Sequence, residues 1–175
     1  MKYNILLIAV VFIFWGCKKD PNKGLYFGIA SATFNGKQWD AGTVRCNINV
    51  PCYKGKLGFE FNVYNKQGLS ETLVFEKIPI AKGNYSINPL NYNDPLCNDT
   101  VATASYSTSN DDVAVDFYNV VPSSSNYFTI NNYNERTKEL TGSFALTFKI
   151  STRQSPNSPD TLKVTNGSFY TKILE

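Results

Sequence analysis

The sequence predicts an all-β protein, built as an antiparallel up-and-down β-sandwich or a partly open barrel of about ten strands. Two observations lead to this class. Apolar and polar residues alternate with a period of two in many short segments, and turn sequences rich in Gly and Asn separate these segments. The chain also has 12 Phe and 11 Tyr, which favour strands, and no segment has a competing helical period. Packing two sheets or closing a barrel would remove exposed strand edges.

In the first half of the chain, a strand at 26–34 and the turn NGK at 35–37 open a hairpin. Alternation then predicts two strands on either side of the turn YKGK at 53–56. Their buried faces hold Val44, Cys46, Ile48 and Val50 in the first strand, and Leu57, Phe59, Phe61 and Val63 in the second. Further strands are predicted at 71–80 and 84–87, around the turn AKGN at 81–84.

The second half continues the pattern, with strands predicted at 102–108, 112–119 and 126–133. The buried face of the second of these is predicted to hold Val113, Val115 and Phe117. The strongest alternation in the chain follows the turn NERTK at 134–138 and places Phe144, Leu146, Phe148 and Ile150 on one buried face. The turn TNGS at 165–168 then separates two last strands at 161–165 and 168–173. Two long irregular loops, at 88–100 and 151–160, are the expected places for recognition.

The N-terminus carries the features of an export signal. Lys2 precedes an unbroken apolar run from Ile5 to Trp15, which is shorter than the roughly 20 apolar residues that a membrane-spanning helix needs. Gly16 directly before Cys17 resembles a bacterial lipobox, in which the cysteine is acylated and becomes the new N-terminus.

We therefore predict a signal peptide at 1–16, a lipidated tether at 17–24 and a single β domain at 25–175. The lipid on Cys17 would hold the protein on a membrane of the cell envelope, and we expect the outer membrane. An ordinary signal peptide or an uncleaved anchor is the alternative interpretation of this segment.

The composition excludes several classes of function. The chain has no histidine, which rules out Ser-His-Asp and Cys-His nucleophilic sites and every imidazole metal site. A formal net charge of only +3 over 175 residues argues against a nucleic-acid partner. We predict neither a cofactor nor a metal site.

Carboxylates keep one enzymatic alternative open. A glycosidase-like hydrolase needs two acids in a cleft, and the candidates are Glu60, Glu76 and Asp116. Alternation places all three on the polar faces of strands, where an acid is usually just solvated. A calcium site could take its oxygen ligands from loop residues Asn93, Asp94, Asp99, Asn110, Asp111 and Asp112. Their spacing matches no EF-hand, and turn formation explains these residues better.

Exposed tyrosines offer the other type of site, because an aromatic plane can pack against the CH-rich face of a sugar. The candidates for ligand binding are Tyr64, Tyr92 and Tyr118, with Asn93 as a hydrogen-bonding amide. Tyr92 and Asn93 lie in the loop at 88–100, whose two prolines restrict its backbone and lower the entropy that binding costs.

Three cysteines remain after lipidation, so one disulfide and one free thiol are expected in an oxidising compartment. In one extended strand Cys46 and Cys52 would lie about 20 Å apart, although Pro51 could break that strand. We therefore favour a disulfide between Cys52 and Cys97, which would leave Cys46 as a small buried hydrophobe. No spacing is CxxC, so no redox role is indicated.

Three stretches carry a resemblance to a known family: ATFNGKQWDA at 32–41, YNERTKELTGSF at 133–144 and LKVTNGSF at 162–169. They resemble the small Bacteroidetes-type lipoproteins that are classed only as a domain of unknown function. The resemblance implies structural roles: turns at Asn35-Gly36 and Asn166-Gly167, a core aromatic at Trp39, and close strand packing at Gly142. It implies no catalytic residue and no ligand.

In such bacteria, Asp-Thr followed by an apolar residue resembles an acceptor for O-glycosylation of exported proteins. Thr100 and Thr161 are the two matching positions. The sequence as a whole predicts a lipid-anchored envelope domain that binds a glycan or an envelope protein, or takes part in an assembly, without being an enzyme.

Overall fold

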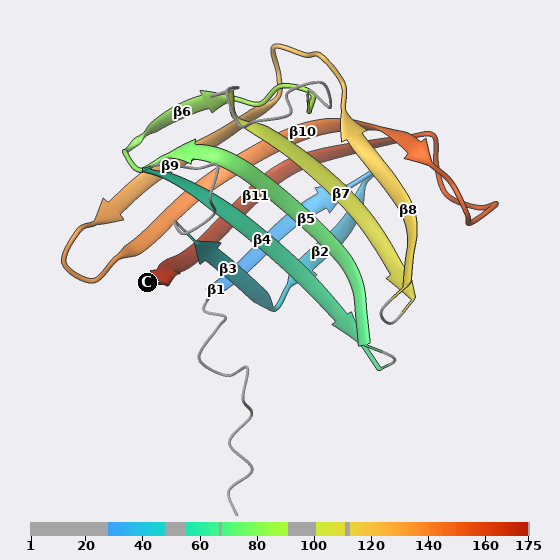
Figure 1. The fold of residues 1–175 in the computed structure, drawn as a ribbon, viewed down its shortest axis with the longest axis horizontal. Coiled ribbons are helices and arrows are strands. Elements are labelled where there is room, and N and C mark those ends of the chain that lie inside the picture. The colour runs from blue at the N-terminus through green and yellow to red at the C-terminus, as the bar shows by residue number, and fades with distance from the viewer. Residues whose placement is uncertain (1–27, 48–54, 67, 91–100, 111–112, 175) are drawn as a thin grey trace, which may run out of the picture.

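The computed structural model describes residues 28–47, 55–66, 68–90, 101–110 and 113–174, and these residues form eleven β-strands (Figure 1). The strands are β1 (Gly28–Phe34), β2 (Lys37–Ala41), β3 (Thr43–Asn47), β4 (Lys56–Asn65), β5 (Gly68–Pro79), β6 (Gly83–Ser86), β7 (Thr103–Asn110), β8 (Val113–Val120), β9 (Tyr127–Asn134), β10 (Glu139–Thr152) and β11 (Thr161–Leu174). The predicted all-β class is confirmed. This described part of the chain has no helix long and apolar enough to span a membrane.

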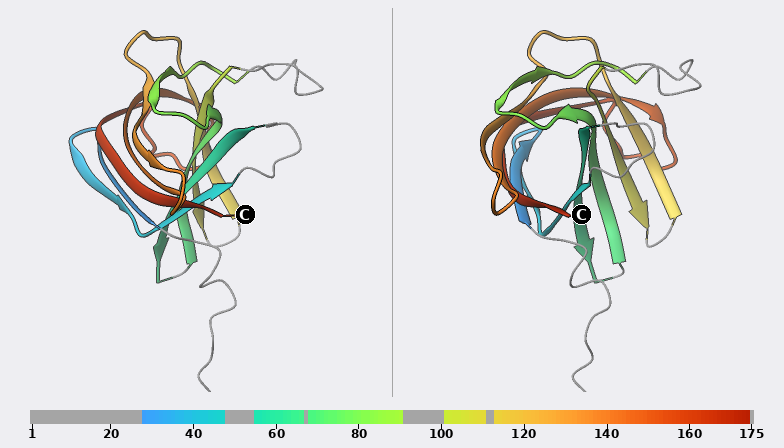
Figure 2. Two further views of the ribbon diagram at one scale, coloured as in Figure 1. Left: turned by 90° about the vertical axis from the view of Figure 1, so that its left-hand side faces the viewer. Right: turned by 60° about the vertical axis from the view of Figure 1, so that its left-hand side comes forward.

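All strands belong to one sheet, in the order β2-β1-β11-β3-β4-β5-β7-β8-β10-β9-β6, with an additional pairing of β10 with β11. Every pairing between strands is antiparallel except the short one between β11 and β3. The sheet curves strongly, so that its two halves face each other across the core (Figure 2). This geometry is consistent with both predicted architectures, the β-sandwich and the partly open barrel.

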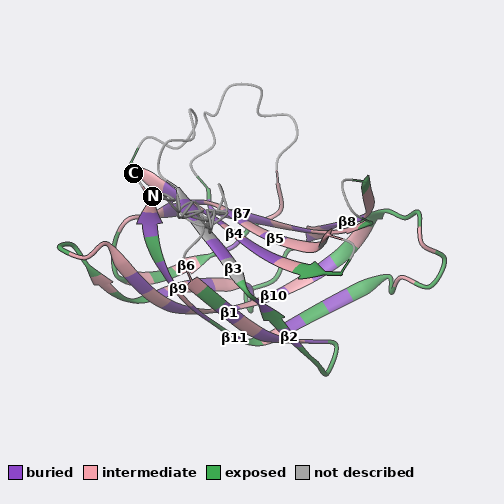
Figure 3. Ribbon diagram, turned by 90° about the horizontal axis from the view of Figure 1, so that it is seen from below, coloured by how far each residue is buried: buried purple, intermediate pink, exposed green. Residues whose placement is uncertain are grey.

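The core is a cluster of interlocked aromatic rings on the inner face of the sheet. Its ring centroids lie 4.6 to 5.8 Å apart for most neighbouring pairs, and its central members are Phe59, Phe61, Phe75, Phe128, Phe144 and Phe169. Figure 3 shows buried and exposed residues alternating along the strands, as a sheet with one inner face requires. Each such ring contributes roughly 1.5 to 3 kcal/mol when it is buried.

The hairpin predicted around Asn35 and Gly36 is present between β1 and β2. Both residues have positive φ angles, 46° and 81°, as the two-residue turn favoured by the strand twist requires. The hairpin brings Trp39 into the core, where it is 6% exposed and stacks on Phe34 with 4.8 Å between ring centroids.

The turn predicted at 165–168 is wrong, because β11 runs through it as one continuous strand. Asn166 has a φ of 54°, and the register shifts here against both β10 and β1, so the residues form a β-bulge. A turn and a bulge both use an Asn with positive φ, and the sequence alone does not distinguish them.

Gly167 and Gly142 make room for aromatic rings across the strand pair. Gly142 pairs with Phe169 and Gly167 pairs with Phe144. A Cβ atom on Gly142 would lie 2.4 Å from the Phe169 ring and 2.0 Å from the Thr129 carbonyl oxygen. A Cβ atom on Gly167 would lie 2.4 Å from the Phe144 ring. The close packing expected at Gly142 is therefore observed.

The predicted face of β8 is also wrong. Val113 is 64% and Phe117 43% exposed, whereas Asp116 and Tyr118 are each 1% exposed. Both faces of this strand carry large side chains, so its alternation is ambiguous. The inner position of Asp116 is stable because other residues supply it with hydrogen bonds.

Candidate functional site

Two carboxylates lie on the inner face of the sheet, in one row across three neighbouring strands. Glu71 of β5 pairs with Thr108 of β7, which in turn pairs with Asp116 of β8. Because neighbouring strands lie about 4.8 Å apart, the two acidic residues are separated by roughly 10 Å at the backbone. Glu71 was not among the predicted site residues, although it stands in phase with Leu73 and Phe75, which are buried.

Glu71 is held by two aromatic side chains. The Nε1 atom of Trp39 donates a hydrogen bond of 2.6 Å to Glu71 Oε2, and the hydroxyl group of Tyr106 donates one of 2.8 Å to the same oxygen. Burial, followed by the negative charge of Glu71, raises the pKa of Tyr106 far above its usual range, so its hydroxyl group remains a donor. Glu71 thus satisfies two polar groups that the core would otherwise leave unpaired.

Asp116 holds the loop between β10 and β11. Its Oδ1 atom accepts hydrogen bonds from the backbone N–H groups of Gln154 at 2.8 Å and Ser155 at 3.0 Å. Its Oδ2 atom accepts hydrogen bonds from the hydroxyl groups of Ser158 and Thr108. Burial acts to raise the pKa of Asp116, but these hydrogen bonds outweigh it and leave the pKa below its ordinary value.

This arrangement makes Asp116 a poor general acid, because a catalytic acid needs a raised pKa to be protonated near neutral pH. The other two predicted acids lie on the outer face of the sheet. Glu60 accepts a hydrogen bond of 2.8 Å from Asn62, and Glu76 accepts one of 3.5 Å from Thr103. The placement of Asp116 on a polar strand face is therefore wrong, whereas Glu60 and Glu76 lie outside as predicted.

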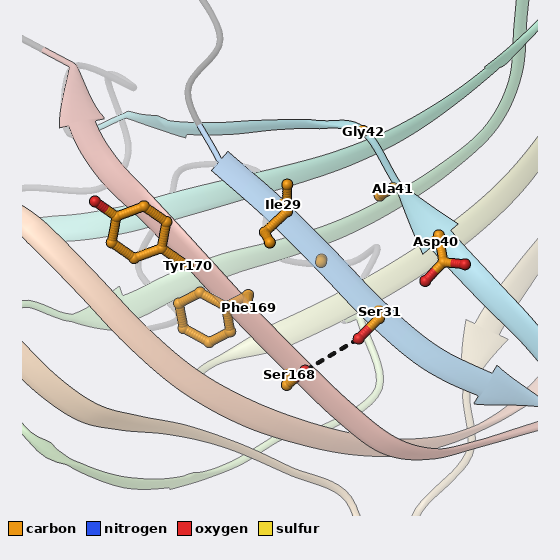
Figure 4. A pocket seen from close by; sticks show the side chains of 9 residues that line it. Ile29, Ser31, Asp40, Ala41, Gly42, Ser168, Phe169 and Tyr170 are labelled. Carbon is orange, nitrogen blue, oxygen red and sulfur yellow. Dashed lines mark hydrogen bonds between the residues drawn. The ribbon is translucent and has the colours of Figure 1, made fainter.

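A hollow of about 520 Å³ lies on the outside of the sheet, over β1, β2 and β11 (Figure 4). This volume falls in the range of about 300 to 1,000 Å³ that is typical of small-molecule sites. It is lined by Ile29, Ala30, Ser31, Asp40, Ala41, Gly42, Ser168, Phe169 and Tyr170. No site was predicted here from the sequence.

The side chains of the hollow form two rows. One row is polar, because Ser31 pairs with Asp40 on β2 and with Ser168 on β11, and the two serine hydroxyl groups are hydrogen bonded at 3.1 Å. The other row is apolar, because Ile29 pairs with Tyr170 and is itself 65% exposed.

The phenol group of Tyr170 is fixed at the rim of the hollow. Its hydroxyl group donates a hydrogen bond of 3.1 Å to Glu139. Partial burial, and then this hydrogen bond to a carboxylate, raise the pKa of Tyr170, so the ring remains neutral.

Of the tyrosines predicted to bind a ligand, Tyr64 is 52% exposed at the end of β4, as expected. The prediction for Tyr118 is wrong, because its ring is buried and packs against Tyr106 with 5.6 Å between centroids. Tyr92 and Asn93 lie outside the described residues.

Of the other predicted site residues, some lie in the described part of the chain and some lie outside it. Cys46 is buried, and this burial raises the pKa of its thiol well above the usual range, which fits a small hydrophobe. Thr161 is exposed at the start of β11. Cys17, Cys52, Cys97 and Thr100 lie outside the described residues, as do the calcium candidates other than Asn110. Among the described residues, no group of three potential metal ligands occurs.

Comparisons of the chain with protein-family models, with curated proteins and with solved structures give no match. The resemblance to small Bacteroidetes-type lipoproteins therefore stays a prediction.

Proposed function

We propose that this protein is a lipid-anchored domain of the cell envelope, at the outer membrane, that binds a glycan or an envelope protein without changing it chemically. The observation that carries the proposal is the hollow on the outside of β1, β2 and β11. It is the size of a small-molecule site and combines an exposed apolar row with a row of hydrogen-bonding groups.

The state of the acids supports binding over hydrolysis. Both inner carboxylates already accept several hydrogen bonds from the protein itself, and these bonds hold the hairpin of β1 and β2 and the loop after β10 in place. A hydrolase would need one acid with a raised pKa beside a second acid in a cleft.

The anchor is tested separately by Cys17→Ser in the native host. The expected result is release of the protein from the membrane fraction, because the acyl chains supply the membrane affinity. Cys17→Ser protein that is processed and stays on the membrane would contradict lipid anchoring.

Binding is tested by passing envelope extract over the immobilised domain and over an Ile29→Ser, Asp40→Ala double variant. The retained material is then analysed for glycans and proteins before and after incubation. We expect wild type to retain a component that is returned intact, and the double variant to lose it. Equal retention by both proteins would exclude the hollow as the site, and cleavage of the retained component would support the hydrolase instead.

A further inference from the structure

The charge of the hollow restricts its ligand. Among the described residues that line it, Asp40 alone carries a charge. A carboxylate repels phosphate and acidic sugars, and it accepts hydrogen bonds without donating any. The preferred ligand is therefore one that offers several donor groups and no negative charge.

The polar row has unused accepting capacity. Asp40 accepts one hydrogen bond of 2.9 Å from Gln38, whereas a carboxylate has about four acceptor positions. Ser31 and Ser168 can each both donate and accept. Cross-strand neighbours lie about 5 Å apart, so Asp40, Ser31 and Ser168 offer three polar contacts along a short straight line. Hydroxyl groups around the edge of one sugar ring match such a line.

The apolar row lies directly beside the polar one, because Ile29 and Ser31 are two residues apart on the same face of β1. Ile29 is 65% exposed, and Figure 4 shows its side chain standing between β11 and β2 in the hollow. Tyr170, which pairs with Ile29, extends this surface toward β10, where its hydroxyl group bonds to Glu139 (Figure 4). Such a surface suits the CH-rich face of a pyranose, whose hydroxyl groups then point sideways to the polar row.

From these features we infer that the hollow binds a neutral saccharide, with the sugar ring on Ile29 and Tyr170 and its hydroxyl groups bonded to Asp40, Ser31 and Ser168. The inference rests on the proposed binding function and names its ligand. Asp40 sets the specificity, because it favours vicinal hydroxyl donors and disfavours anionic sugars.

The test is calorimetric titration of the full domain with neutral hexasaccharides of β-glucose, α-mannose and N-acetylglucosamine. An oligogalacturonate of the same length serves as the anionic probe, and a glucosamine hexamer as the cationic one. We expect one neutral series to bind and the anionic probe to fail. Asp40→Ala and Ile29→Ser should each weaken binding by about tenfold or more.

Two matched controls separate the hollow from general effects. Glu135→Ala removes an exposed acid and Val113→Ser an exposed apolar side chain, each away from the hollow, and neither should change the affinity. The inference is overturned if no neutral probe binds up to about 10 mM. It is also overturned if only the cationic probe binds, or if the two hollow variants bind like wild type. If the domain still retains a component of envelope extract, and this retention depends on Ile29 and Asp40, then the assignment of a neutral saccharide is wrong but the proposed binding function stands.

Discussion

Replacing Asp116 should loosen the loop between β10 and β11 and destabilise the whole domain. Asp116→Ala removes the acceptor for two backbone N–H groups and two hydroxyl groups, and hydrogen bonds to a charged group contribute about 1.5 to 3 kcal/mol each. Gln154 is an exposed residue, so water can replace part of what Asp116 supplies and the four contributions do not add in full. We expect a loss of about 3 kcal/mol in the free energy of unfolding.

Asp116→Asn should cost less, about 1 to 2 kcal/mol, because the amide oxygen still accepts hydrogen bonds but the charge is gone. The native pKa of Asp116 is lowered, so its charge stabilises the fold above the unfolded pKa of about 3.9, and that contribution is lost as the pH falls through the native pKa. The difference between wild type and Asp116→Asn should therefore be complete at pH 7 and shrink below about pH 4.

Urea unfolding at pH 7 and at pH 3 measures the stability loss of Asp116→Ala and the pH dependence of the difference between wild type and Asp116→Asn. In a thermal melt, the expected loss of about 3 kcal/mol in Asp116→Ala corresponds to a decrease of about 6 to 12 °C in the melting temperature. Amide exchange at Gln154 and Ser155 should become faster in the same variant. Asp160→Asn is the control in the same loop, because Asp160 forms an exposed ion pair with Arg153 and should cost less than about 1 kcal/mol. If both Asp116 variants have the wild-type free energy of unfolding at pH 7, the hydrogen bonds of Asp116 do not stabilise the fold as we expect.

Three further predictions test the core and the inner carboxylate. Phe144→Asp should unfold the domain, because it buries a charge at a fully buried position, whereas exposed Lys149→Asp should move the melting temperature little; equal shifts would show that the register is wrong. Gly142→Ala should cost about 3 kcal/mol or more in urea unfolding, since backbone and ring atoms occupy the space of its Cβ atom, and a wild-type value would contradict that packing. Glu71→Ala should cost about 1 to 3 kcal/mol and shift the fluorescence of Trp39, whose indole N–H loses its acceptor; an unchanged spectrum would argue against this contact.

The alternation of apolar residues predicted the inner faces of β4 and β10 correctly, because one face of each strand is plainly more apolar than the other. It failed for β8, where Val113 and Phe117 lie outside and Asp116 inside. The burial of Asp116 depends on donors from a loop far along the chain, and no local pattern contains that information.

The hollow was not predicted because, as for Asp116, the residues that form it are far apart along the chain. Its polar row is assembled by the pairing of β1 with β11, which joins Ser31 to Ser168, 137 positions apart in the sequence. Each serine alone is an ordinary outward-facing strand residue. Exposed tyrosines were predicted at positions 64, 92 and 118 but not at Tyr170, because nothing near Tyr170 in the sequence marks a binding surface.

The position of β11 in the sheet determines when the domain can be completed. Among the described strands, β11 pairs with β1, β3 and β10, and β1 has no strand partner outside its own hairpin until β11 is in place. Such non-local pairing makes folding slow, because a long loop must close before the contact forms. Without β11, the edges of β1, β3 and β10 would be open to other molecules, which raises the risk of aggregation.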